Sequence, residues 1–227
     1  MLRQLSGILT VLLTFLWTVG TPAAVQAQAQ GDIKDLTDSA SFHRRYDGGD
    51  AGDNLGFSMA RGDINGDGIP DLIVGAAGDD NNGRSQSGSV YVIYGAAGSS
   101  TGNTFDLANA TNFNLRFDGA EGREQFGWSV ASGDVNNDGF DDVMAGSERA
   151  NNNGRSASGS VYVIYGAAGS STGNTFDLAD STSFNLRFDG AVAGDELGHS
   201  VASGDVNNDG VEDIIAGAIQ TDNNSRN

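Results

Sequence analysis

Residues 63–71 read Asp-Ile-Asn-Gly-Asp-Gly-Ile-Pro-Asp, and the same pattern of oxygen-bearing side chains returns at 134–142 and 205–213. Positions 1, 3 and 5 of each nine-residue loop carry Asp, Asn and Asp, whose side chains can converge on one centre. Glycine at position 6 allows a sharp turn with a positive φ. A backbone carbonyl at position 7 and the Asp at position 9 would complete the shell of roughly six to eight oxygens that Ca²⁺ prefers.

The sequence therefore predicts three Ca²⁺ sites, one in each loop. The expected ligands are Asp63, Asn65, Asp67, Ile69 and Asp71 in the first loop, Asp134, Asn136, Asp138, Phe140 and Asp142 in the second, and Asp205, Asn207, Asp209, Val211 and Asp213 in the third.

Other interpretations of these loops are weaker. An EF-hand needs a bidentate Glu at position 12 and flanking helices, whereas position 12 is Val74, Ala145 or Ala216 inside an apolar run. Asp, Asn and Gly also make ordinary hairpin turns, but three copies that keep every oxygen ligand favour metal binding. Mg²⁺ prefers fewer carboxylates and more waters than these loops offer.

The chain repeats with a period of 71 residues. The segment Ser87–Ala108 returns unchanged at Ser158–Ala179, and the loops keep the same spacing. The period divides the chain into 31–47, the last strand of a preceding unit, then 48–118, 119–189 and a truncated third unit at 190–227. The stop at Asn227 falls before a third strand is due, so a longer parent protein is expected.

Four strands are expected in each unit, at 57–61, 71–76, 89–94 and 112–117 in the first. Residues 90–94 are apolar on both faces, as in a strand covered from both sides. Clusters of Asn, Gly and Ser at 78–88 and 95–104 predict long loops. Tandem four-stranded units predict an all-β fold of antiparallel β-propeller blades. A β-helix or a β-sandwich explains the period less well.

About two and three-quarter blades, with eleven strands, are too few to close a ring, since propellers typically have roughly four to eight blades. We therefore expect self-association, or a C-terminal remainder that completes the ring.

Composition restricts the partners and the compartment. The net charge of −18 disfavours nucleic acid, whose phosphates would be repelled. Arg3, the apolar run 8–19 and small residues up to Ala29 predict a secretory signal peptide over 1–29. No second apolar run follows that could span a membrane, so we expect a secreted or cell-surface protein. The sequons at Asn109 and Asn223 are consistent with a glycoprotein.

The units resemble the FG-GAP repeats of the integrin α-chain propeller. Phe126-Gly127 matches the opening motif, Leu55-Gly56 and Leu197-Gly198 replace its Phe, and Gly75-Ala76-Ala77 stands where the family has Gly-Ala-Pro. The resemblance covers about 31–227 and implies seven-bladed propellers with calcium loops on one face of some blades. It also implies a role in adhesion, with an extracellular protein or glycan ligand.

Enzyme motifs are absent from the sequence: it has no Ser-His-Asp order, zinc motif or phosphate loop. We therefore expect a non-enzymatic binding module; the alternative is the propeller module of a secreted, phospholipase-like hydrolase.

His199 occupies the position of Phe57 and Trp128 in the other units, so a packing role is expected. Arg61-Gly62-Asp63 matches an adhesion tripeptide, but Ser132 and Ser203 replace Arg61 in the other units, which makes the match incidental.

Overall fold

The computed structural model describes residues 39, 43–98, 102–169 and 171–220. These residues all belong to one compact unit, Leu36–Asn227. The predicted signal peptide and the sequon at Asn223 lie outside the described residues. Within the described part of the chain, no helix is long and apolar enough to cross a membrane.

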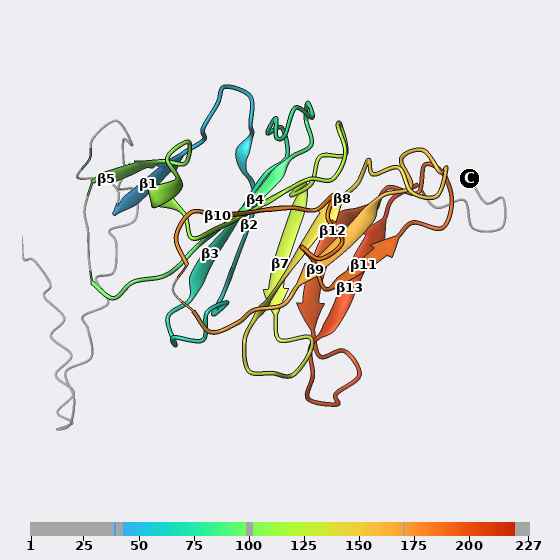
Figure 1. The fold of residues 1–227 in the computed structure, drawn as a ribbon. Helices are drawn as coiled ribbons and strands as arrows, with labels where there is room; N and C mark the ends of the chain where they lie inside the picture. Colours follow the sequence, from blue (N-terminus) through green and yellow to red (C-terminus); the bar gives the residue numbers. More distant parts are fainter. Residues whose placement is uncertain (1–38, 40–42, 99–101, 170, 221–227) are drawn as a thin grey trace, which may run out of the picture. The chain divides into compact units, whose positions relative to one another are not determined.

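The first blade is built from strands β2 (Leu55–Gly62), β3 (Asp71–Ala76), β4 (Ser89–Ile93) and β6 (Leu115–Asp118), paired antiparallel in this order. β7 (Ser129–Gly133), β8 (Asp142–Ser147), β9 (Ser160–Ile164) and β11 (Leu186–Asp189) repeat the arrangement in the second blade. β12 (Leu197–Gly204) and β13 (Asp213–Ala218) form the first hairpin of a third (Figure 1). The predicted all-β fold of antiparallel blades is therefore confirmed, as an open propeller-like stack that does not close.

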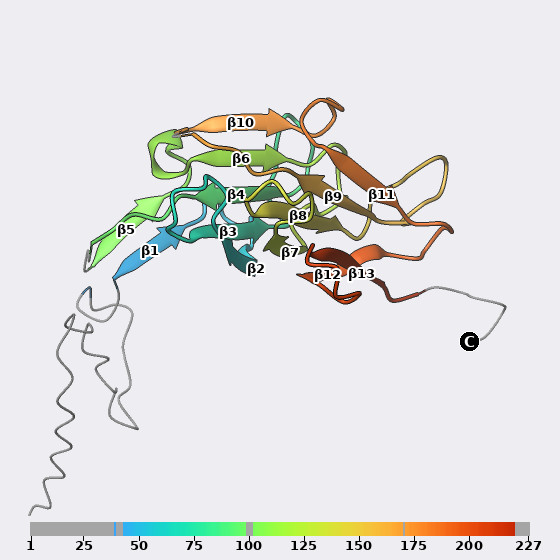
Figure 2. The same cartoon turned by 90° about the horizontal axis from the view of Figure 1, so that it is seen from below.

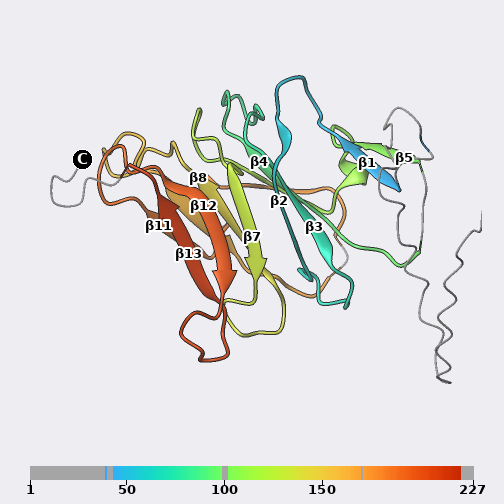
Figure 3. The same ribbon diagram turned by 180° about the vertical axis from the view of Figure 1, so that it is seen from behind.

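Neighbouring blades pack face to face because the middle strands are apolar on both sides. Val90 and Val92 of β4 belong to one buried cluster with Val143 and Tyr162 of the second blade. Tyr91 points to the opposite face, in a separate cluster with Phe113. The opening strands β2, β7 and β12 lie side by side (Figure 3), so the calcium-type loops that follow them emerge at one end of the stack.

Two strands were not expected from the sequence. β5 (Asn103–Asp106) and β10 (Asn174–Asp177) lie in or beside segments expected to be loops, and they bring the described strands to thirteen instead of eleven. β10 pairs in parallel with β6, and β5 pairs in parallel with β1 (Arg44–Asp47), as Figure 2 shows. Each repeat thus covers the outer edge strand of the preceding blade. A short 3₁₀ helix, η2 (Ala110–Asn112), also replaces the start of the expected fourth strand.

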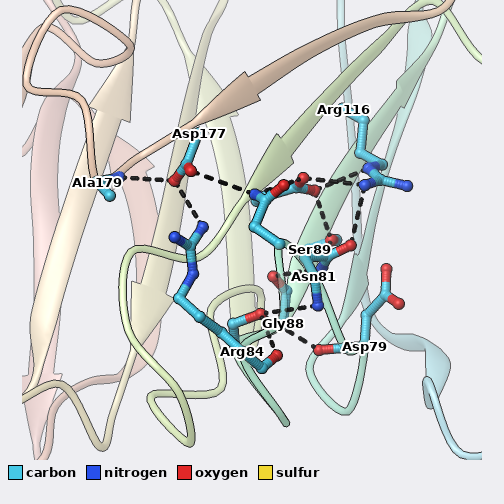
Figure 4. Close-up of polar contacts among 11 residues, drawn as sticks. Asp79, Asn81, Arg84, Gly88, Ser89, Arg116, Asp177 and Ala179 are labelled. Carbon is cyan, nitrogen blue, oxygen red and sulfur yellow. Dashed lines mark hydrogen bonds and ion pairs between the residues drawn. The ribbon is translucent and has the colours of Figure 1, made fainter.

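Side chains reinforce this connection between repeats. The ring of Phe176 on β10 stacks on Phe117 of β6, with centroids 5.1 Å apart. Arg84 Nη2 donates to Asp177 Oδ1 at 2.6 Å, and Figure 4 shows the two side chains facing each other. The buried Asp118 beside them is held by Arg116 at 2.7 Å. We name Arg84, Phe117, Phe176 and Asp177 the blade latch.

Candidate metal centre

Each loop between the opening strand and the next is folded around its own acidic side chains. In the first copy, the carboxylate of Asp63 accepts the backbone N–H groups of Asp67 at 3.0 Å and Gly68 at 2.8 Å. Asn65 Oδ1 accepts the same Asp67 N–H at 2.9 Å, and Asp67 Oδ1 accepts the N–H of Ile69 at 2.8 Å. The second and third loops repeat all four hydrogen bonds. The side chains at positions 1, 3 and 5 are therefore fixed to the loop backbone by the same four hydrogen bonds in all three copies.

Two positions of each loop adopt a left-handed backbone. Gly68 at position 6 has φ 82°, as the sequence indicated. Position 4 is also left-handed, with φ 72° at Gly66, 59° at Asn137 and 62° at Asn208. Glycine and asparagine are the residues that tolerate this region, so the identity of position 4 was a signal that the sequence analysis missed.

The Asp at position 9 anchors the loop to the blade. Asp71 and Asp142 are buried at the start of β3 and β8. Asp142 Oδ2 accepts the N–H of Val135 at 3.0 Å, and its Oδ1 accepts the N–H of Gly166 at 2.9 Å, where the third strand has just ended. Asp71 makes the same two contacts, and Asp213 makes the first of them. Each oxygen keeps a second lone pair with which it could face a cation.

The electrostatics of the loops fit a bound cation. Burial raises the pKa of Asp142 to about 6, and repulsion from Asp138 and Asp134 adds to the rise. Burial likewise raises the pKa of Asp71, with a contribution from Asp67. Among the ion pairs of the described residues, none involves a loop carboxylate. The negative charge at positions 1, 5 and 9 is thus the kind that a divalent cation would neutralise.

Adjacent loops contact each other. Asp141, next to the position 9 acid of the second loop, accepts the backbone N–H of Asp63 through Oδ2 at 2.8 Å. Any side chain larger than that of Gly66 would collide with the Phe140 ring, so this ring packs directly on the first loop. Asp141 therefore links two blades. The position 7 carbonyls of Ile69, Phe140 and Val211 stay predicted ligands.

The histidines have different surroundings. His43 precedes β1, whereas His199 on β12 packs against Trp128 with ring centroids 5.9 Å apart, which agrees with its expected packing role. His199 also makes a polar contact that the sequence did not indicate: its Nδ1 lies 2.6 Å from Glu148 Oε2.

Comparison with known proteins agrees with this architecture. The FG-GAP repeat model matches residues 55–93, 126–164 and 197–225. A phosphatidylinositol-glycan-specific phospholipase D of Rattus norvegicus is 34% identical over 161 residues, which cover 71% of this chain and 18% of that protein. The Homo sapiens protein of the same name is 31% identical over 164 residues, with 72% and 18% covered. Integrin alpha-8 of Gallus gallus is 30% identical over 173 residues, with 72% and 14% covered.

These relatives correct one prediction. The expectation of a non-enzymatic protein is wrong, because relatives that match across the repeats are named as phospholipases D, which are enzymes. The chain spans less than a fifth of the length of these relatives, and the repeats are the part it shares. With three matched copies on an all-β blade architecture, the chain is an FG-GAP repeat protein related to both integrin α chains and phosphatidylinositol-glycan-specific phospholipases D.

Proposed function

We propose that the three loops each bind one Ca²⁺ ion and that the chain is a secreted, calcium-stabilised propeller module. The observation that carries the proposal is the set of backbone hydrogen bonds that orders Asp63, Asn65 and Asp67, and that is the same for their counterparts in all three repeats. The raised pKa of Asp142, to about 6, supports it, since an unneutralised carboxylate there is costly. Isothermal titration with Ca²⁺ should count three sites; a chain that binds no Ca²⁺ at millimolar concentration would contradict the proposal.

We further propose that this module serves a phospholipase-type enzyme as its substrate-binding part. The named activity of several relatives supports this choice, and the substrate class would be a phosphatidylinositol glycan. A propeller can present loops from several blades on one surface, which suits a glycan headgroup. The test is binding to vesicles that carry a glycosylated phosphatidylinositol, compared with plain phosphatidylinositol vesicles, in calcium and after chelation. Equal binding to both vesicles would contradict the proposal.

Adhesion is the second candidate, because integrin alpha-PS2 and integrin alpha-8 also match the repeats. In that case the ligand would be an extracellular protein or a free glycan. An array of matrix proteins and glycans, probed in calcium and after chelation, distinguishes the two: calcium-dependent capture by matrix proteins without vesicle binding favours adhesion.

A ring or a neighbouring molecule would cover the outer faces of the stack. Met59 on β2 exposes 67% of its surface, and Ile215 on β13 exposes 43%. Apolar patches of this kind mark interaction surfaces. We therefore propose that this chain self-associates through its terminal blades, which light scattering coupled to size exclusion would reveal; a single monomeric peak at high concentration would refute it.

A further inference from the structure

We propose that Glu148, Glu196 and His199 bind a transition-metal ion of the zinc type, at a site distinct from the calcium loops. Glu148 follows β8 of the second blade, Glu196 precedes β12 of the third, and His199 lies within β12. One ligand atom from each residue lies within 4.8 Å of the other two. Imidazole and carboxylate groups are the usual nitrogen and oxygen ligands of Zn²⁺, at roughly 2.0–2.2 Å.

The site places the buried carboxylate of Glu148 near the half-buried carboxylate of Glu196. The Glu148 side chain is only 4% exposed, and its one hydrogen bond to another side chain among the described residues is to His199. Arg149 Nε lies 3.5 Å from Glu148 Oε1, but the Arg149 side chain is largely exposed, so it neutralises the charge of Glu148 only weakly. Glu196 accepts a hydrogen bond from Gln220 Nε2 at 2.9 Å, and no ion pair among the described residues includes it. A divalent cation would neutralise both carboxylates.

The repeat provides an internal comparison for this site. One period earlier, at the junction of the first and second blades, the same three positions are Ala77, Gln125 and Trp128. Trp128 packs against Phe57, with ring centroids 4.4 Å apart, just as His199 packs against Trp128. An aromatic ring therefore satisfies the packing at this position. Residues of the kind that bind metals occupy all three positions at the junction of the second and third blades, but not at the junction of the first and second. Packing does not explain this difference between otherwise closely matched repeats.

A pocket beside the cluster would give the ion access and a further ligand. Its volume is about 360 Å³, and Glu196, Arg123 and Arg149 are among its lining residues. The corresponding pocket of the first blade has Gly52 and Gly78 where these arginines stand. Three protein ligands leave a fourth position of a tetrahedral ion for water or an anion, and the two guanidinium groups would attract an anion there.

Binding requires His199 and Glu148 to move slightly apart and Glu196 to approach them from at most 4.8 Å. The present 2.6 Å between His199 Nδ1 and Glu148 Oε2 is a hydrogen-bond distance. Two ligand atoms of a tetrahedral Zn²⁺ ion are about 3.3 Å apart, as follows from metal–ligand bonds of roughly 2.0–2.1 Å. The imidazole and the carboxylate would therefore separate by less than about 1 Å, which side-chain rotation can provide.

The test is titration of the chain without its predicted signal peptide, residues 1–29, with Zn²⁺ in excess Ca²⁺, which keeps the acidic loops occupied. Calorimetry counts the zinc sites, and fluorescence reports on Trp128, the single tryptophan beyond the predicted signal peptide. We expect one zinc site whose occupation changes the Trp128 emission, because this ring touches His199.

The matched variants exchange residues between repeats, so each introduced side chain already occurs at its structural position. His199→Phe, Glu148→Ala and Glu196→Gln should each weaken zinc binding by roughly tenfold or more, with unchanged circular dichroism in calcium. The triple variant Ala77→Glu, Gln125→Glu, Trp128→His should gain a second zinc site. Zinc binding that is absent from the parent chain, or equal in the parent and His199→Phe, would overturn the proposal and leave an ordinary hydrogen bond between the blades.

Discussion

The metal-free protein should lose stability as the pH rises from about 5 to about 7.5. Burial raises the pKa of Asp142 to about 6 and that of Glu124, which is almost fully buried, to about 7. A carboxyl group with a raised folded-state pKa binds its proton more tightly in the folded than in the unfolded chain. Stability is therefore lost as the group ionises, between its unfolded and folded pKa values.

The size of the effect follows from these two shifts. One pKa unit corresponds to roughly 1.4 kcal/mol. Over this pH interval, Asp142 should lower the free energy of unfolding by about 1 kcal/mol and Glu124 by about 2 kcal/mol. Calcium changes only the first contribution, because a bound cation favours the charged form of Asp142, whereas Glu124 lies outside the loops.

The assay is urea unfolding of the metal-stripped chain at both pH values, repeated with saturating Ca²⁺ and with Glu124→Gln. We expect the free energy of unfolding to fall less between the two pH values with Ca²⁺ than without it, and to fall still less in metal-stripped Glu124→Gln. With Ca²⁺ and Glu124→Gln combined, the fall should disappear or reverse. A metal-stripped parent that is more stable at the higher pH would refute the reasoning, and an identical pH slope with and without Ca²⁺ would show that Asp142 does not face a cation.

The other predictions concern single contacts and the assembly. Asp138→Ala removes one charged ligand but no core packing, so calorimetry should count one Ca²⁺ site fewer than in the parent; an unchanged count would show that this loop is only a turn. Arg84→Ala should lower the free energy of unfolding by about 1 kcal/mol, because it breaks a charge-assisted bond of the blade latch; a double-mutant cycle with Asp177→Ala measures the coupling, and a zero coupling energy would contradict the latch. Replacing the exposed Met59 by Thr should reduce the self-association seen by light scattering; an unchanged particle mass would show that this face does not mediate it.

The sequence predicted the parts of the fold that depend on local pattern. Strand β3 begins and ends where expected, because Asp71 closes the loop and an apolar run follows it. Strand β4 was predicted to be covered on both faces, and each of its residues is buried. In both cases the period of the apolar residues decides the structure.

Strands β5 and β10 could not be predicted in this way. Each has four residues, of which a single Phe is strongly apolar, and each pairs with a strand of the preceding repeat more than fifty residues away. The pairing arises because β6 and β1 would otherwise present an open edge, a property of the assembled blade that no local pattern carries.

The two kinds of candidate site, the acidic loops and the contact between Glu148 and His199, also differ in how far the sequence predicts them. Positions 1, 3, 5 and 9 of the loops carry oxygen-bearing side chains at a spacing that the sequence shows directly, and their role as Ca²⁺ ligands stays a prediction. The contact between Glu148 and His199 joins residues of different repeats, so only the packing of the blades reveals it.

Thermal unfolding of the chain without its first 29 residues, in EDTA and then in millimolar Ca²⁺, tests the central claim most directly. Extracellular calcium modules bind with dissociation constants of about 0.1–1 mM, so at ten times that concentration each site adds roughly 1.4 kcal/mol. Three sites would raise the midpoint by roughly 10 °C for a domain of this size. A rise of that order is the predicted result, and a midpoint that is the same in EDTA and in Ca²⁺ would contradict calcium binding by these repeats.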